Sequence, residues 1–359
     1  MRRSLAAFSA FQRRAFSGAF RAAALLSLAV APAAAAASES QASSAQLFDQ
    51  IDPAVQAVMQ LPAPPALRYQ ARDGSLLAYR YFQPATAAVP QSVVAVLMHG
   101  SAGSSLNMTV LGQALAKSGV PAFALDARGQ GLSGRRGDIS YIGQEDDDLA
   151  DFVTVVRRTY PNANLVLVGH SAGGGFVLRI AGEAMGRLFN QFVLLSPVLG
   201  RLGPTNRPDV GWARPKIGAI LLLKALNSVG VTAFNGATAV DFHLPPGAEK
   251  FGLTRSWSFR MMSNYGPRGQ TQLFGQPAYK VDADRAPAPI IIVAGAADEQ
   301  FYADKYAIAF KGLAHPVIVK LAPGVNHMGV VSDPRSVPLI VAAVLEARLP
   351  LAPIQEGSQ

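Results

Sequence analysis

Continuous apolar runs alternate along most of this chain with stretches of helical periodicity, and no other feature limits the fold so strongly. Strands buried on both faces read as unbroken apolar runs. The pattern therefore predicts an α/β fold with a mostly parallel central sheet and helices on both faces. The predicted strands are residues 92–98, 121–125, 164–168, 191–195, 289–294 and 316–321, and the predicted helices are 108–118, 144–160, 173–188, 302–313 and 334–347.

The alternation is interrupted between residues 199 and 285. This segment is rich in proline and contains an apolar stretch at 217–226 and an aromatic cluster around Trp257. An insertion between strands of an α/β sheet is expected to cover their carboxyl ends, where ligands bind in such folds. We therefore predict a cap, the alternative being a surface excursion without a part in the chemistry.

The rest of the chain falls into four parts. A hairpin is expected at the start of the core, because residues 66–71 and 76–82 flank Asp73-Gly74, a pair suited to a tight turn. The predicted organisation is a signal peptide at 1–37, a lead-in and linker at 38–65, a first core part at 66–198, the cap at 199–285 and a second core part at 286–350.

The first 37 residues have the anatomy of an export signal: an arginine-rich start, an apolar run and a run of alanines where a signal peptidase could cut. The pair Arg13-Arg14, followed by Phe16, also resembles a twin-arginine signal. We expect an exported, periplasmic or secreted protein. The alternative is an N-terminal membrane anchor, which the short apolar run and Pro32 disfavour.

Charge and cysteine content exclude several classes of function. The net charge of +9 suggests an anionic partner, but the leader holds five arginines and no acid, and without it 27 bases face 23 acids, a charge of +4. We therefore expect no nucleic-acid partner. The chain has no cysteine, which excludes disulfides, Cys-based metal sites and a cysteine nucleophile. We expect no cofactor and no metal.

Ser171 is the centre of Gly169-His170-Ser171-Ala172-Gly173, a G-x-S-x-G pattern. A serine hydroxyl is a weak nucleophile until a base accepts its proton and a turn aims it at the substrate. The small flanking residues allow a strained strand-to-helix turn that lifts the serine above the sheet edge. Chance alone could supply the pattern, but here a strand-like run precedes it and a helical stretch follows. This context predicts that Ser171 is a nucleophile.

The base should be a histidine beyond the last strand, because folds with this turn order their triad as serine, acid, histidine. Only His327 lies in a loop after the last predicted strand. The other four are His99 and His170 before Ser171, His243 in the presumed cap, and His315 at the wrong end of the last strand. His327 is therefore the predicted base.

The acid that orients this histidine should lie at a strand tip near its loop. Asp298 follows the strand at 289–294 and is favoured, with Glu299 and Asp284 as competitors. The oxyanion of the tetrahedral intermediate needs backbone N–H donors. We expect these from Ala172 and from Ser101, because His99-Gly100-Ser101 allows close backbone approach. The alternative, a phosphate cradle at this loop, lacks the Lys-Ser/Thr of a P-loop.

These residues together resemble the monoacylglycerol lipase and lysophospholipase branch of the α/β-hydrolases, also grouped with serine aminopeptidase-like hydrolases. The resemblance rests on the loop at Ser101, the stretch 126–134 (DARGQGLSG), the elbow at Ser171, Asp298 and His327, and spans roughly residues 66–350. In the family a histidine stands where this chain has Gln130.

The resemblance implies attack by Ser171 on a carboxylic ester, an acyl-enzyme, and hydrolysis by water activated by His327. The apolar content of the presumed cap favours a hydrophobic or fatty-acyl ester as the small-molecule partner, with transient contact between the cap and a lipid surface. One alternative is an aminopeptidase or amidase with the same triad, which would need an acid from Asp209, Asp241 or Glu249 to hold the substrate amine. Another is a catalytically silent binding protein.

Overall fold

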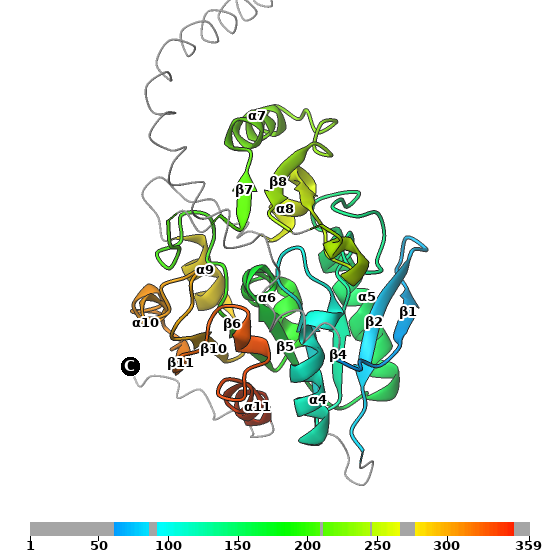
Figure 1. The fold of residues 1–359 in the computed structure, drawn as a ribbon, viewed down its shortest axis with the longest axis vertical. Helices are drawn as coiled ribbons and strands as arrows, with labels where there is room; N and C mark the ends of the chain where they lie inside the picture. Colours follow the sequence, from blue (N-terminus) through cyan, green and yellow to red (C-terminus); the bar gives the residue numbers. More distant parts are fainter. Residues whose placement is uncertain (1–60, 86–91, 209–210, 245, 266–276, 348–359) are drawn as a thin grey trace, which may run out of the picture. The chain divides into compact units, whose positions relative to one another are not determined.

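The computed structural model describes residues 61–85, 92–208, 211–244, 246–265 and 277–347, all within one compact unit of residues 48–359. Their main feature is an eight-stranded sheet of order β1-β2-β4-β3-β5-β6-β10-β11 (Figure 1). All neighbours from β4 to β11 are parallel, whereas β1 and β2 are antiparallel. The strands are β1 (Ala66–Gln70), β2 (Leu76–Phe82), β3 (Val93–Met98), β4 (Ala122–Leu125), β5 (Asn164–His170), β6 (Gln191–Leu195), β10 (Ile290–Gly295) and β11 (Ile318–Ala322).

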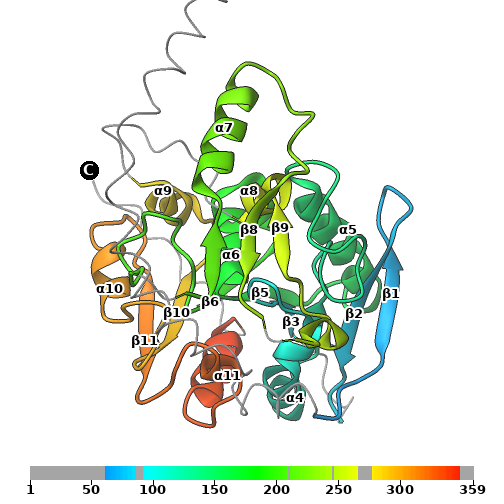
Figure 2. The ribbon, with the colours of Figure 1, turned by 45° about the horizontal axis from the view of Figure 1, so that its top comes forward.

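Helices cover both faces of this sheet, as Figure 2 shows. On one face lie α4 (Thr109–Lys117) and α11 (Val337–Glu346), and on the other lie α5 (Gln144–Thr159), α6 (Ala172–Gly182) and α9 (Ala278–Arg285). The strands supply apolar side chains to both layers, because successive residues point to opposite faces. In β3, Val94 and Val96 pack with α5 and α6, and Ala95 and Leu97 pack with α4 and α11. The predicted α/β class is confirmed.

Two predicted helices are shorter than expected. The stretch 173–188 forms α6 only to Gly182, then an extended residue, Glu183, and the 3-10 helix η3 (Ala184–Leu188). Glycine is a poor helix former, and the α-carbon of Gly182 also lies against Asp282, where a Cβ would come within 2.5 Å. The stretch 302–313 is helical only in α10 (Lys305–Ala309). Short 3-10 helices also occur at η2 (Ser105–Met108), η4 (Ala248–Phe251) and η5 (Gly329–Val331).

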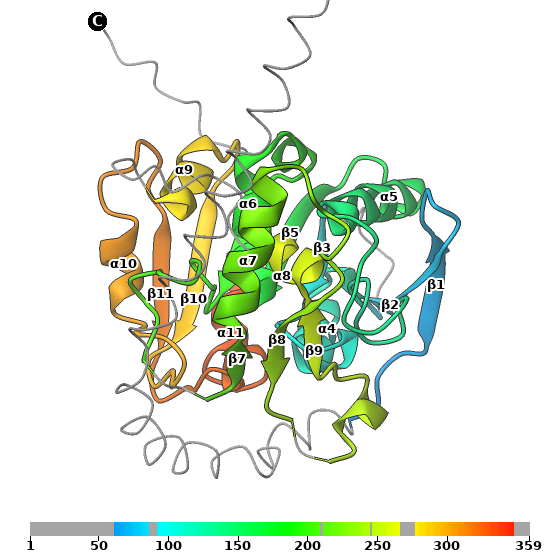
Figure 3. The same ribbon diagram turned by 90° about the horizontal axis from the view of Figure 1, so that it is seen from above.

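The inserted segment, residues 199–285, has its own small antiparallel sheet, which the sequence did not predict. Its strands are β7 (Ala213–Pro215), β8 (Thr238–Phe242) and β9 (Ser256–Ser258), in the order β7-β8-β9. Two helices accompany it, α7 (Ile217–Ser228) and α8 (Phe259–Tyr265). In Figure 1, α7 lies beyond this small sheet, and Figure 3 looks down on it. The last helix of the segment, α9, packs against α6 of the core.

The inserted segment contacts loops at the carboxyl ends of the central strands. The N–H of Thr254 donates to Ala102 O in the loop after β3, and the N–H of Ser258 donates to Gly137 O in the long loop after β4. The segment therefore lies over the end of the sheet at which Ser171 is found. None of the described helices has the length and apolarity to cross a membrane. The leader predicted at 1–37, and the lead-in up to residue 60, lie outside the described residues.

Candidate active site

Ser171 lies at the sharp turn between β5 and α6, with φ of 53° and ψ of −117°. The glycines on either side make this turn sterically feasible. A Cβ on Gly169 would lie 2.3 Å from Gly173 O, and one on Gly173 would lie 2.4 Å from His99 O. A larger residue at Gly169 would push β5 and α6 apart, and one at Gly173 would push α6 away from the end of β3, so the turn depends on both glycines.

The loop after β3 lies directly against this elbow. A Cβ on Gly100 would come within 3.2 Å of the Cβ of Ser171, so only glycine fits without displacement. Ser101 follows Gly100 in this loop, and its hydroxyl accepts a hydrogen bond from Trp212 Nε1 of the inserted segment at 3.3 Å. Ala172 begins α6, where the first N–H groups of a helix have no partner within the helix. Of the two predicted oxyanion donors, Ala172 therefore follows Ser171 in the chain, and Ser101 follows Gly100, which packs against Ser171.

His327 and Asp298 meet at the carboxyl ends of two adjacent strands. Asp298 follows β10 and His327 follows β11, and parallel pairing of these strands places the two loops side by side. His327 Nδ1 lies 2.9 Å from Asp298 Oδ2, and both side chains are buried. The second oxygen, Asp298 Oδ1, accepts the N–H groups of Gln300 and Phe301 at 2.8 and 2.9 Å.

These contacts decide the charge of Asp298. Burial raises the pKa of the carboxyl, but the interaction with His327, together with hydrogen bonds from Ser196 and from the N–H of Phe301, lowers it, and the net direction is downward. An ionised carboxylate only accepts hydrogen bonds, so His327 Nδ1 carries the proton of this pair. With the proton on Nδ1, the basic lone pair of the imidazole is on Nε2.

The two competing acids have other partners. Glu299 Oε2 accepts the backbone N–H of His327 at 2.9 Å and does not contact its ring nitrogen Nδ1. Asp284 Oδ1 accepts the N–H of Ala314 at 3.0 Å. Of the three candidates, the structure thus brings only Asp298 to the imidazole. The role of Glu299 was missed in the sequence, because no local pattern indicates a bond to a backbone amide 28 residues away.

Two of the remaining histidines hold loops of the site together. His99 accepts the N–H of Ala127 at Nε2 and pairs through Nδ1 with Gly100 O. Its pKa is lowered by burial. His170 Nε2 donates to the carbonyl of His327 at 3.1 Å, and burial lowers its pKa to about 3. Both rings are therefore neutral near pH 7. His99 connects the loops after β3 and β4, and His170 connects the elbow to the loop after β11.

A structure of a soluble variant of monoglyceride lipase from Saccharomyces cerevisiae resembles the chain with a TM-score of 0.58, covering 80% of this chain and 97% of that one at 18% identity. The chain has the α/β-hydrolase fold. The structure of Paleococcus ferrophilus monoacylglycerol lipase gives a TM-score of 0.54 over 76% of this chain and 99% of that one, at 19% identity.

The sequence also has relatives over part of its length. Residues 89–229 match the family described as Serine aminopeptidase, S33. Monoglyceride lipase of Rattus norvegicus is 31% identical over 128 residues, which are 35% of this chain and 41% of that one. Monoacylglycerol lipase of Mycolicibacterium smegmatis is 30% identical over 111 residues, 31% of this chain and 39% of the relative. The matched regions thus span about two fifths of these relatives' lengths, and the family resemblance expected from the motifs is confirmed there.

Gln130, which stands where the family has histidine, belongs to a buried network between core and inserted segment. Its Nε2 donates to the hydroxyl of Tyr265 in α8 at 2.8 Å. That hydroxyl donates to Glu145 Oε1 in α5 at 2.8 Å, and Asn264 Nδ2 donates to Glu145 Oε2 at 2.6 Å. Glutamine at this position therefore still makes a polar connection between this loop and α8.

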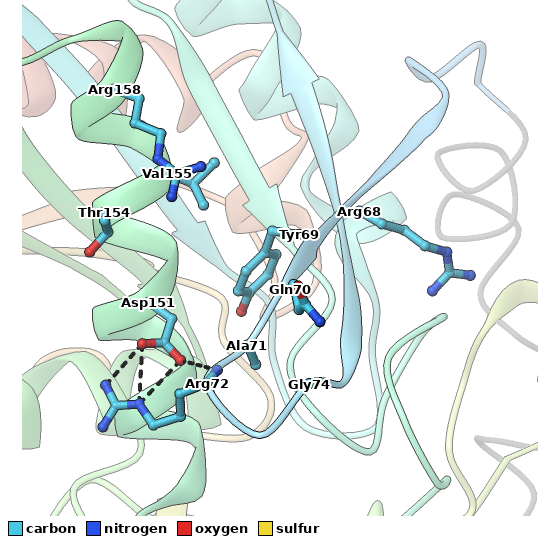
Figure 4. A pocket seen from close by; sticks show the side chains of 10 residues that line it. All are labelled: Arg68, Tyr69, Gln70, Ala71, Arg72, Gly74, Asp151, Thr154, Val155 and Arg158. Carbon is cyan, nitrogen blue, oxygen red and sulfur yellow. Dashed lines mark hydrogen bonds and ion pairs between the residues drawn. The ribbon is translucent and has the colours of Figure 1, made fainter.

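A cavity of about 670 Å³ lies elsewhere, between β1 and the outer side of α5 (Figure 4). Arg72 occupies one end of it, where its guanidinium pairs with Asp151 at 3.0 Å. Arg68 points away from the space in Figure 4, and Arg158 of α5 also lines it. The cavity shares no lining residue with the site at Ser171. Within the described residues no three His, Asp or Glu side chains are placed to hold a metal ion.

Proposed function

We propose that the chain is a serine hydrolase that cleaves a carboxylic ester through Ser171, His327 and Asp298. The observation that carries the proposal is the 2.9 Å pair between His327 Nδ1 and Asp298 Oδ2, at the same sheet end as the strained turn of Ser171. A buried ionised acid, an oriented imidazole and a serine on a sharp elbow are the parts that acyl transfer requires.

In the proposed reaction, the hydroxyl oxygen of Ser171 attacks the ester carbonyl while Nε2 of His327 takes its proton. The N–H groups of Ala172 and Ser101 stabilise the negative oxygen of the tetrahedral intermediate. His327 then gives the proton to the leaving alcohol, which departs and leaves an acyl-enzyme. A water molecule, activated by the same nitrogen, releases the acid and returns the proton to Ser171.

Ester cleavage is favoured over aminopeptidase or amidase activity by the partners of the acids in the inserted segment. An amine of a peptide substrate would need a carboxylate to bind it. Asp241 pairs with Lys216 at 3.1 Å, and Glu249 forms an ion pair with Arg255. Asp209 lies outside the described residues. These two carboxylates thus already have a cationic partner, and the other two described acids of the segment, Asp282 and Asp284, lie in α9.

A hydrophobic acyl chain is favoured by α7 and by the relatives. Ile220 and Leu223 of α7 are buried, whereas Leu221 and Leu222 are 62% and 60% exposed. Other exposed apolar side chains follow the helix at Val229 and Phe234. We propose that this surface contacts lipid while a monoacylglycerol-like ester enters, because the sequence relatives are named monoglyceride or monoacylglycerol lipases. Export through the arginine-rich leader is part of the same proposal, and the mass of the N-terminal peptide from a periplasmic fraction would test it.

Two assays test the proposed function. A fluorophosphonate probe should label the wild-type protein at Ser171 and leave Ser171→Ala unlabelled. Hydrolysis of p-nitrophenyl esters of increasing acyl length should then exceed hydrolysis of aminoacyl anilides. Absence of an adduct on folded wild-type protein would assign the chain to the catalytically silent class, and faster anilide turnover would assign it to the amidases.

A further inference from the structure

Two adjacent carboxylates hold His327 at different points. Asp298 holds the ring through Nδ1, and Glu299 holds the backbone N–H through Oε2, each at 2.9 Å. The backbone carbonyl of His327 accepts a hydrogen bond from His170 Nε2. The main chain and the ring of His327 are thus fixed from two sides, by the loop after β10 and by the elbow.

The bond from Glu299 is separate from the contacts that build the two loops. The N–H of Ala297 donates to Val325 O at 2.9 Å, and Gly295 packs so tightly on Val325 O that a Cβ would come within 2.2 Å. These backbone contacts remain when the side chain of residue 299 changes. Glu299 is also exposed, so its substitution leaves no cavity in the core.

We propose that Glu299 is a positioning residue, which fixes the backbone of His327 so that its ring meets Ser171 in the reactive orientation. The proposal rests on the proposed function and adds a residue to it. Catalytic groups must be held to within about 0.5 Å of the productive geometry, and the bond from Glu299 fixes the N–H side of the His327 backbone, which the His170 bond to its carbonyl does not reach. The carboxylate also adds a negative charge beside the imidazolium that forms during attack.

The charged and titratable groups around His327 are few. Asp298 and Glu299 face it from the loop after β10, and Arg207 of the inserted segment reaches the carbonyls of Asp298 and Phe301. From the elbow side the ring of His170 lies 4.8 Å away and is neutral. Among the described residues, Glu299 is thus the charged group whose carboxylate bonds the His327 backbone, and it can be changed without removing the pair between His327 and Asp298.

Glu299→Ala and Glu299→Gln separate the hydrogen bond from the charge. Glutamine keeps an oxygen acceptor and loses the charge, whereas alanine loses both. We expect Glu299→Ala to lower kcat for a p-nitrophenyl ester about tenfold with KM within twofold, and Glu299→Gln to keep kcat within threefold. In both variants the pH of half-maximal rate should fall by a few tenths of a unit, because a cationic imidazole is less stabilised. Glu346→Gln, which removes an exposed glutamate paired with Lys320, should change none of these values.

A purely structural role for Glu299 would lower the melting temperature and leave kcat and the pH profile of the folded enzyme unchanged, and this result would overturn the proposal. Equal kcat in the alanine and glutamine variants would overturn it as well. NMR titration of the His327 ring, which needs no turnover, keeps the test independent of the proposed function. We expect a lower titration midpoint in Glu299→Gln than in wild type and a weakened Nδ1–H signal in Glu299→Ala. These results support the proposal even if no ester is cleaved. Unchanged spectra in both variants contradict it.

Discussion

Ser171 has a positive φ, which residues other than glycine rarely adopt, and hydrogen bonds to neighbouring residues fix this conformation. Its N–H donates to Leu195 O at 2.9 Å, and its carbonyl accepts the N–H groups of Gly175 and Val198 at 3.0 Å. These bonds join the turn to β6 and to the first turn of α6. The surrounding structure thus imposes the positive φ, which costs about 1–3 kcal/mol at a residue with a Cβ.

The strain at Ser171 predicts different stabilities for two inactive variants. Ser171→Gly removes the Cβ and relieves the strain, whereas Ser171→Ala retains it. Glycine costs about 0.5–1 kcal/mol in backbone entropy, so we expect Ser171→Gly to be more stable than Ser171→Ala by about 1 kcal/mol. Urea denaturation of both variants measures this difference. Both should lose the proposed activity by roughly 10⁶-fold, the loss known for the nucleophile of a serine hydrolase. An alanine variant as stable as the glycine variant would mean that the strain does not exceed the glycine entropy cost of about 0.5–1 kcal/mol.

Between elements, the junction of α5 and α8 depends on a buried acid. Glu145 lies in the first turn of α5 and accepts hydrogen bonds from Tyr265 and Asn264 of α8. Burial raises the pKa of Glu145 from its usual 4.5 to about 8, and the two hydrogen bonds only partly oppose this effect. The protonated carboxyl is therefore favoured in the folded protein near neutral pH.

This raised pKa predicts a loss of stability with rising pH. Between pH 4.5 and about 8 the folded state binds a proton at Glu145 that the unfolded state has released, so the free energy of unfolding falls by up to about 1.4 kcal/mol per pH unit. Glu145→Gln resembles the protonated form and removes this dependence. We expect the variant to gain stability relative to wild type between pH 5 and pH 8, as measured by urea denaturation. Parallel pH profiles for the two proteins would contradict the assignment.

At the scale of the whole molecule, the strands of the core could be predicted from the sequence, whereas the small sheet of the inserted segment could not. Buried parallel strands are continuous apolar runs, so β3, β5, β6 and β10 were predicted to within one or two residues. Strands of three residues, as in β7 and β9, are too short to show any alternation. The pairing of His327 with Asp298 follows from strand order, whereas the bonds of Glu299 and His170 to the His327 backbone depend on loop geometry that no sequence period encodes.

The exposed side chains of α7 predict that the whole molecule works at a lipid surface. The double substitution Leu221→Ser and Leu222→Ser removes apolar surface that is already exposed to water, so the fold should be unaffected. Each leucine that no longer inserts into lipid should weaken the free energy of membrane binding by on the order of 2 kcal/mol. We expect the double variant to bind phosphatidylcholine vesicles at least tenfold more weakly and to hydrolyse vesicle-borne monoacylglycerol more slowly, with unchanged turnover of a soluble p-nitrophenyl ester. Ile308→Ser, on α10 and 70% exposed, is the matched control and should behave as wild type. Equal losses on the soluble and vesicle-borne esters would instead mean that α7 shapes the site itself.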